Sequence, residues 1–173
     1  NRQVATNNAE AFAYVANALN QYTNIADGVV ITPQYDSDGN LTNYGAIAYA
    51  WDAENRLVGV SSNGQWLASY SYDYMSRRIG KATPAVTNTF TYDGWAMIQE
   101  VRLTPNASPI TNSYIYGLDL SGTIQGAGTI GGLLASYSSG IVRFFYYDAN
   151  GNVTDLVDAN GASVAHYEYD LYG

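Results

Sequence analysis

The chain has 173 residues, about the length of one ordinary domain, and 47% of them are hydrophobic, which is enough for a folded core. Only 13% are charged, and 7 basic against 15 acidic residues give a net charge of −8, so the sequence offers no basic run that would bind nucleic acid or an anionic membrane surface. The absence of cysteine excludes disulfides and thiolate metal sites, and no apolar stretch approaches the roughly 20 residues that cross a bilayer.

The residue types predict an all-β fold. The chain holds 17 Tyr and 17 Gly together with many Asn, Thr and Ser, and these residues favour short strands and tight turns. Residues 3–24 are the exception, because AEAFAYVANALNQY has an alanine-rich, helical composition. Its aromatic residues Phe12 and Tyr14 also fit strand alternation, and because the repeats that follow are β-like we favour a strand there.

A dipeptide of Tyr or Trp followed by Asp recurs along the chain. The copies are Tyr35-Asp36, Trp51-Asp52, Tyr72-Asp73, Tyr92-Asp93, Tyr147-Asp148 and Tyr169-Asp170. The successive gaps are 16, 21, 20, 55 and 22 residues, and a unit near this length fits two strands and two turns. The long gap holds Tyr114-Ile115-Tyr116-Gly117, which we interpret as a further copy without its Asp.

Strand and turn signals surround each dipeptide. Alternating aromatic and polar residues precede it, as in SYSYD at 69–73 and HYEYD at 166–170, and this period of two predicts half-buried strands. Asp at the start of a turn can accept backbone N–H groups two residues on, and Gly or Asn can then supply the positive φ that closes a hairpin. We assign to these repeat turns Tyr35, Asp36, Gly39, Trp51, Asp52, Tyr72, Asp73, Tyr92, Asp93, Tyr147, Asp148, Gly151, Tyr169 and Asp170.

The stretch DANGNVTDLVDANG at 148–161 raises a choice between a cation site and two turns. A calcium loop of the EF-hand kind needs its glycine one position later and a glutamate that closes the loop. Neither is present, so we predict two similar turns at opposite ends of one strand, Asn152 to Val157.

The repeats resemble the YD repeats of bacterial RHS-repeat proteins, and the resemblance covers essentially the whole chain. The units that carry it are YDSDGNLT (35–42), WDAENRLVGV (51–60), YDGWAMIQE (92–100) and YDANGNVTDLVDANGASVAHYEYDLYG (147–173). The stretches NALNQYT (17–23) and YGLDLSGTIQGAGTIGGLLA (116–135) are also similar to sequences common in that family.

The resemblance implies a spiralling antiparallel sheet of successive hairpins. In larger RHS proteins, and in the related teneurins and insecticidal toxin complexes, such sheets form a hollow shell that commonly encloses a C-terminal toxin released by self-cleavage. This chain stops at YEYDLYG, about where the family continues into its core region, and Leu171 stands where the family often has Pro. We therefore expect neither the cleavage motif nor the toxin in this chain, and carry over only the scaffold.

Other chemical patterns in the sequence are weaker. The glycines of Gly126–Gly131 match G-x-G-x-x-G, but no helix-forming segment follows them, so we expect a loop and not a dinucleotide site. His166 is the only histidine, and without a second His or a Cys we expect an exposed strand residue and not a metal ligand. Carboxylate pairs suited to a hydrolase belong mostly to repeated turns; they are Asp36/Asp38, Asp52/Glu54 and Glu168/Asp170.

We predict that residues 1–173 form a single YD-repeat array of about seven to eight units, with no separate catalytic domain. The expected function is structural: a wall segment of a β-shell or β-solenoid, or a self-assembling extracellular fibre built by edge-to-edge strand pairing, in a secreted or cell-surface bacterial protein. The alternative is a carbohydrate-binding module that stacks glycans on exposed Tyr and on Trp51, Trp66 or Trp95, and a third hypothesis, which we rank below it, is a carboxylate-pair hydrolase. We expect no enzymatic activity, cofactor or metal, and as partners only further copies, other parts of a longer RHS protein or glycans, without nucleic acid or membrane insertion.

Overall fold

The computed structural model describes residues 4–7, 10–27 and 29–170. This described part consists of β-strands, turns and loops, and none of it is helical. No helix that could cross a membrane occurs among the described residues. The chain divides into two compact units, residues 1–71 with 82–84 and residues 72–81 with 85–173.

The first unit begins with a four-stranded antiparallel sheet whose strands follow chain order. The strands are β1 (Val4–Asn7), β2 (Glu10–Ala16), β3 (Tyr22–Asp27) and β4 (Val29–Ile31). The segment with helical composition therefore forms strand β2, because its backbone groups pair with β1 and β3 on either side. The preference for strand in this region is confirmed.

The same unit continues as a ladder of antiparallel strands, each paired with its predecessor in the chain. Pro33 precedes the first of them, at the interruption between β4 and β5, where its missing N–H cannot serve a central strand. The strands are β5 (Gln34–Tyr35), β6 (Leu41–Tyr44), β7 (Ile47–Trp51), β8 (Leu57–Ser62) and β9 (Gln65–Tyr72).

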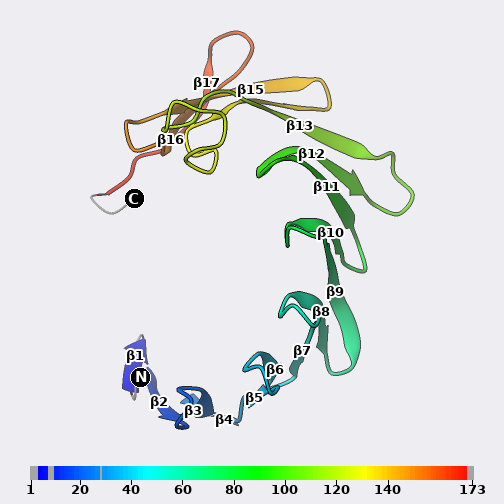
Figure 1. The fold of residues 1–173 in the computed structure, drawn as a ribbon, viewed down its shortest axis with the longest axis vertical. Helices are drawn as coiled ribbons and strands as arrows, with labels where there is room; N and C mark the ends of the chain where they lie inside the picture. Colours follow the sequence, from blue (N-terminus) through cyan, green and yellow to red (C-terminus); the bar gives the residue numbers. More distant parts are fainter. Residues whose placement is uncertain (1–3, 8–9, 28, 171–173) are drawn as a thin grey trace. The chain divides into compact units, whose positions relative to one another are not determined.

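The second unit is built in the same way from antiparallel strands that follow chain order (Figure 1). They are β10 (Arg78–Ala82), β11 (Thr87–Asp93), β12 (Ala96–Leu103), β13 (Ile110–Tyr116), β14 (Leu133–Ser138), β15 (Ile141–Tyr147), β16 (Val153–Val157) and β17 (Ser163–His166). The strand expected between the two DANG turns is β16, and the all-β fold of antiparallel hairpin repeats is confirmed.

Each unit is thinly packed, because its strands mainly contact their neighbours within the same sheet. The buried alanines of the described part are Ala68, Ala96 and Ala135, Pro33 and Gly132 are also buried, and no large side chain there is fully buried. Most of the described tyrosines are half-buried. Stability must therefore come mainly from contacts between adjacent strands, as in repeat proteins.

Candidate functional site

The recurring structural element of the chain is a five-residue turn that begins with aspartate. At Asp148 the backbone N–H donates to the Asn152 carbonyl at 3.0 Å, and the Gly151 N–H donates to the Asp148 carbonyl at 3.1 Å. The Asp148 Oδ1 atom accepts the N–H groups of Asn150 and Asn152, both at 2.9 Å. Oδ2 accepts the Asn152 side-chain amide at 2.9 Å, and Gly151 closes the turn with a φ of 82°. We call this arrangement the Asp turn.

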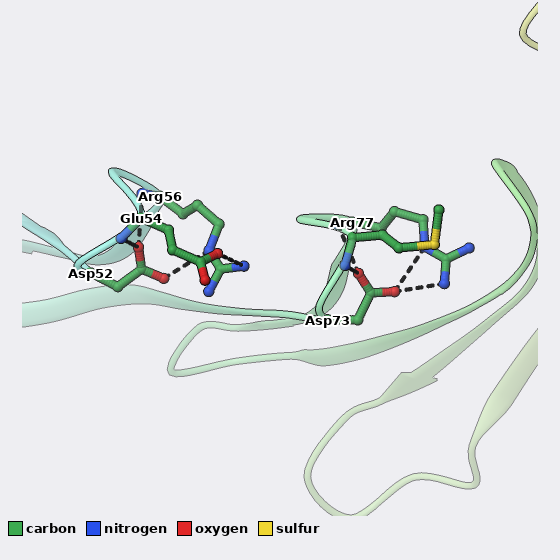
Figure 2. Close-up of polar contacts among 6 residues, drawn as sticks. Asp52, Glu54, Arg56, Asp73 and Arg77 are labelled. Carbon is green, nitrogen blue, oxygen red and sulfur yellow. Dashed lines mark hydrogen bonds and ion pairs between the residues drawn. The ribbon is translucent and has the colours of Figure 1, made fainter.

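The Asp turn also begins at Asp36, Asp52, Asp73 and Asp158, with the same backbone bonds and the same acceptance of N–H groups by Oδ1. The fourth residue has positive φ in each copy: Gly39, Asn55, Ser76 and Gly161. The fifth residue donates a side-chain hydrogen bond to Oδ2 where it is Asn40, Arg56 or Arg77, and Ala162 has no such donor. Figure 2 shows this shared geometry at the Asp52 and Asp73 turns.

The hydrogen bonds of the turn hold the pKa of each first aspartate below its usual range. The main cause is the side chain of the fifth residue at Asp36 and Asp148, and the backbone N–H of the fifth residue at Asp52 and Asp158. At Asp73 desolvation works against the shift, but the hydrogen bonds from the fifth residue outweigh it and lower the pKa. The turns therefore depend on ionised carboxylates.

The aromatic residue before the Asp forms a second recurrent contact. The Tyr147 hydroxyl donates to the Leu133 carbonyl at 2.6 Å, and the Trp51 indole Nε1 donates to the Leu41 carbonyl at 2.8 Å. The corresponding acceptors are the Tyr22 carbonyl for Tyr35 at 3.2 Å, the Arg78 carbonyl for Tyr92 at 2.9 Å and the Val153 carbonyl for Tyr169 at 2.7 Å. Every one of these acceptors is the first residue of an earlier strand.

A β-bulge positions this aromatic residue. The strand register shifts immediately before Tyr35, Trp51, Tyr92, Tyr116 and Tyr147. At β15, for example, Tyr146 pairs with Asp155 but Tyr147 pairs with Val153, so that Thr154 of the outgoing strand has no opposite residue. Such a bulge increases the local twist and re-aims the neighbouring side chain, here toward the preceding strand.

The pairing partners and the acceptors are the same residues, and this links one repeat to the next. Leu133 lies opposite Tyr116 and accepts from Tyr147, while Val153 lies opposite Tyr147 and accepts from Tyr169. Burial raises the pKa of Tyr116 and Tyr147, and a second contribution to the pKa of Tyr147 comes from Tyr116. We call this series of contacts the aromatic ladder.

The Tyr92-Asp93 copy departs from the pattern after its aromatic residue. Asp93 lies opposite Ala96, so β11 and β12 are joined by a two-residue turn of Gly94 and Trp95. Gly94 has a φ of 55°, as a type II′ hairpin requires at its first central position. Asp93 therefore ends a strand and does not begin an Asp turn.

Asp119 begins an Asp turn that sequence reasoning missed. Its N–H donates to the Thr123 carbonyl at 2.7 Å, its Oδ1 accepts the Ser121 N–H at 2.9 Å, and Gly122 has a φ of 72°. The Asp119 side chain is buried, and its Oδ2 also accepts the N–H groups of Ala127 at 2.7 Å and Thr129 at 3.2 Å. The long gap in the repeat thus contains its Asp, two residues beyond the expected place.

Residues 117–132 form a loop that this aspartate organises and that contacts two neighbouring turns. Gln125 donates to the Asp93 carbonyl at 2.8 Å and accepts the Trp95 N–H at 2.7 Å, which secures the β11–β12 turn. Gly151 of another turn lies directly against the loop, because a Cβ atom added there would approach Ile130 Cγ2 to 2.7 Å. The G-x-G-x-x-G motif lies within this loop and is followed by strand β14, so no helix N-terminus is present to receive a pyrophosphate.

The three tryptophans and the histidine have different local surroundings. Trp51 is committed to the aromatic ladder, Trp66 lies on β9 and is 46% exposed, and Trp95 is 59% exposed at a hairpin tip of the second unit. His166 contacts Asp155 through Nδ1 at 2.9 Å, and this ion pair raises the pKa of the imidazole.

The carboxylate pairs serve local turns and ion pairs. Asp52 and Glu54 both contact Arg56. No group of three or more metal-ligating side chains occurs within residues 4–7, 10–27 and 29–170.

No protein-family profile matches the chain. Among curated proteins, the chain is 32% identical over 159 residues, or 91% of its length, to the tRNA3(Ser)-specific nuclease WapA of Bacillus spizizenii. It is 31% identical over the same length to the tRNA nuclease WapA of Bacillus subtilis (strain 168). The chain spans only 6% of the length of each of these relatives.

Solved structures share the fold. A crystal structure of TcdB2-TccC3-Cdc42 matches 92% of the chain with a TM-score of 0.64 and 16% identity, and the match covers 9% of that protein. The Tc holotoxin pore of Photorhabdus luminescens matches 94% of the chain with a TM-score of 0.52 and 16% identity, over 10% of that protein. These matches place the antiparallel repeat fold within large toxin-complex proteins.

The comparisons correct one expectation. We expected no enzyme, whereas the curated relatives are named as tRNA nucleases. The expectation was wrong because it was drawn from the repeats alone, which correspond to 6% of those proteins. The names of these relatives also mention a nucleic acid, tRNA. Our expectation that this chain has no nucleic-acid partner stays a prediction.

Proposed function

We propose that the chain is a scaffold segment of a longer RHS-repeat protein of the tRNA-nuclease class to which WapA belongs. In this proposal its hairpins form a single array and contribute to the wall of a larger β-structure, in a bacterial protein that is secreted or held at the cell surface. The nuclease is the whole polypeptide, and this segment forms part of its structural framework.

The aromatic ladder carries this proposal. Five of the aromatic residues bind a strand-initial carbonyl of a neighbouring repeat through one hydrogen bond, as Tyr147 binds Leu133 and Tyr169 binds Val153. An element that recurs from repeat to repeat suits a structure extended by addition of units, because stability is then a sum of neighbour interfaces. The similarity to long proteins, of which the chain covers 6%, also supports a part within a larger array.

The edge of the sheet at β17 supports further pairing as part of the same proposal. Within the described part of the chain β17 pairs with β16 alone, so its outer backbone groups are available to another strand. The occupant is the adjoining part of the parent protein, and a second copy takes its place when the 173-residue chain is isolated. Analytical ultracentrifugation should then show a mass that increases with concentration, and a constant monomer mass would contradict edge pairing.

The scaffold role is tested in the full-length parent with matched tyrosine variants. Tyr147→Phe with Tyr169→Phe removes two ladder bonds, and Tyr146→Phe with Tyr167→Phe removes hydroxyls from neighbouring exposed positions. We expect the first pair to lower resistance to trypsin while tRNA cleavage per intact molecule is unchanged, and the second pair to alter neither. Lost cleavage with unchanged resistance to trypsin would contradict the scaffold role and place these residues in the catalytic machinery.

A further inference from the structure

A recess on the second unit gathers the scarce basic residues of this acidic chain. It has a volume of about 360 Å³ and is lined by Arg78 and Lys81 of β10, Asn88, Phe90 and Tyr92 of β11, and Glu100 of β12. Arg102 lies opposite Asn88 in the β11–β12 register, which places their Cβ atoms about 5 Å apart beside the recess. Three of the 7 basic residues of the chain are therefore at one place, although the sequence showed no basic run.

The basic side chains are accessible, and two of them lack a counter-charge. Arg78, Lys81 and Arg102 are all exposed. Lys81 and Arg102 form no ion pair within the described ranges of the chain. Elsewhere the chain pairs its arginines closely, as Arg56 with Asp52 and Arg77 with Asp73. The recess thus has a locally positive potential on a protein of net charge −8.

The carboxylate in the recess is satisfied by neutral donors. Glu100 Oε1 accepts from the Asn88 side-chain amide at 2.6 Å, and Oε2 accepts from the Asn112 amide at 3.2 Å. Tyr114 is also hydrogen-bonded to Glu100, and its pKa is raised, first by burial and then by that carboxylate. Glu100 is therefore held within the sheet by neutral donors, and it shares the recess with two basic residues, Arg78 and Lys81.

An aromatic surface adjoins these charges. The guanidinium carbon of Arg78 lies 5.8 Å from the centre of the Phe90 ring, within the range of a cation–π contact. A ligand that reaches Lys81 can also pack an apolar group on Phe90, because both residues line the same recess.

We propose that this recess binds an acidic peptide segment. A carboxylate of the segment lies between Lys81 and Arg102, and the apolar side chain next to it packs on Phe90. A peptide fits better than a nucleic acid, because a continuous array of phosphates would be repelled by the remaining surface of an acidic chain, whereas one or two carboxylates need only the local charge. This inference is independent of the proposed scaffold function.

The test is isothermal titration calorimetry of the whole chain with an acetylated hexapeptide of alternating Glu and Phe. The same peptide with Gln for Glu is the neutral probe, and hexathymidylate is the nucleic-acid probe. We expect the acidic peptide to bind and the Gln peptide to bind at least about tenfold more weakly, since charged hydrogen bonds are lost. An increase in sodium chloride concentration should weaken the binding of the acidic peptide and leave that of the Gln peptide unchanged.

Matched variants locate the site. Lys81→Gln and Arg102→Gln should each lower the affinity for the acidic peptide by about threefold or more, while Lys81→Arg retains binding. Arg143→Gln removes a basic residue of β15 that does not line the recess and should leave binding unchanged. Absence of binding by the acidic peptide, equal weakening by all three Gln variants, or binding of hexathymidylate alone would each overturn the proposal. Circular dichroism confirms that each variant is folded.

Discussion

The hydroxyl group of Tyr147, at the end of β15, donates a 2.6 Å hydrogen bond to the carbonyl oxygen of Leu133, the first residue of β14. Leu133 in turn lies opposite Tyr116, the terminal aromatic residue of the preceding repeat. One residue thus pairs with one repeat and accepts a hydrogen bond from the next. This double use explains why an aromatic residue with a polar hydrogen recurs before the turn, and why Trp51 can replace Tyr.

The two DANG turns differ in their surroundings, which makes their glycines a matched pair. Gly151 and Gly161 have φ values of 82° and 83°, so alanine at either position should cost about 1–2 kcal/mol of backbone strain. A Cβ atom at Gly151 would also lie 2.7 Å from Ile130 and 2.9 Å from Leu120, whereas none of the surrounding atoms lies within 4 Å at Gly161. We expect Gly151→Ala to be more destabilising than Gly161→Ala by about 1–3 kcal/mol of unfolding free energy in urea. Equal losses would contradict the contact between the loop and this turn.

The contribution of the fifth residue of the Asp turn can be tested by adding its side-chain hydrogen bond where that bond is missing. The Asp158 turn ends in Ala162, whereas Asn152 at the same position donates to Asp148 Oδ2 at 2.9 Å. Ala162→Asn should add the missing bond and raise the Tm by up to about 2 °C. Ala162→Leu at the same site supplies no donor and should not raise it, and equal Tm values for the two variants would argue against a role for the side-chain bond.

Acid should weaken the fold through the aspartates of the turns. Their pKa is lowered in the folded state by hydrogen bonds, so their contribution is present above the unfolded pKa of about 4 and is lost as the pH falls through the folded pKa. The contribution of these aspartates to the Tm should therefore be nearly constant between about pH 7 and 5, and the Tm should fall steeply below about pH 4. Asp148→Asn cannot titrate, and its acid-dependent loss should be smaller than that of the parent chain. A Tm that rises below pH 4 would contradict a stabilising role of the ionised aspartates.

His166 should give a separate effect near neutral pH. Its hydrogen bond with Asp155 raises the pKa of the imidazole in the folded state, so its contribution is complete below the unfolded pKa of about 6.5 and is lost as the pH rises through the folded pKa. The difference in stability between the parent and His166→Asn should therefore be larger at pH 5.5 than at pH 9. A difference that grows with pH would contradict the ion pair.

The local chemistry of the turns could be read from the sequence because each depends on few residues. Asp148, Asn150 and Gly151 specify an Asp turn almost by themselves, and β16 follows because two such turns bracket it. The turn after Asp93 differs because glycine follows the aspartate immediately, and a glycine at the first central position favours a two-residue type II′ hairpin.

Other features depend on contacts that no short window contains. Asp119 was missed because Gly117 and Leu118 separate it from Tyr116, and its burial depends on the return of the chain at residues 127–129. The bulges before the aromatic residues are hidden by the period-two alternation, which continues through them on the incoming strand. The basic recess was missed because β10 and β12 are separated in sequence and meet only across β11.

The central claim is that the terminal aromatic side chain joins each repeat to the preceding one through its polar hydrogen. Urea unfolding of Tyr147→Phe beside Tyr146→Phe tests it most directly, because the two residues are adjacent on β15 and Tyr146 is 54% exposed. We expect Tyr147→Phe to lower the unfolding free energy by about 1 kcal/mol, and Tyr146→Phe to change it by less than about 0.5 kcal/mol. Equal effects of the two substitutions would contradict the claim.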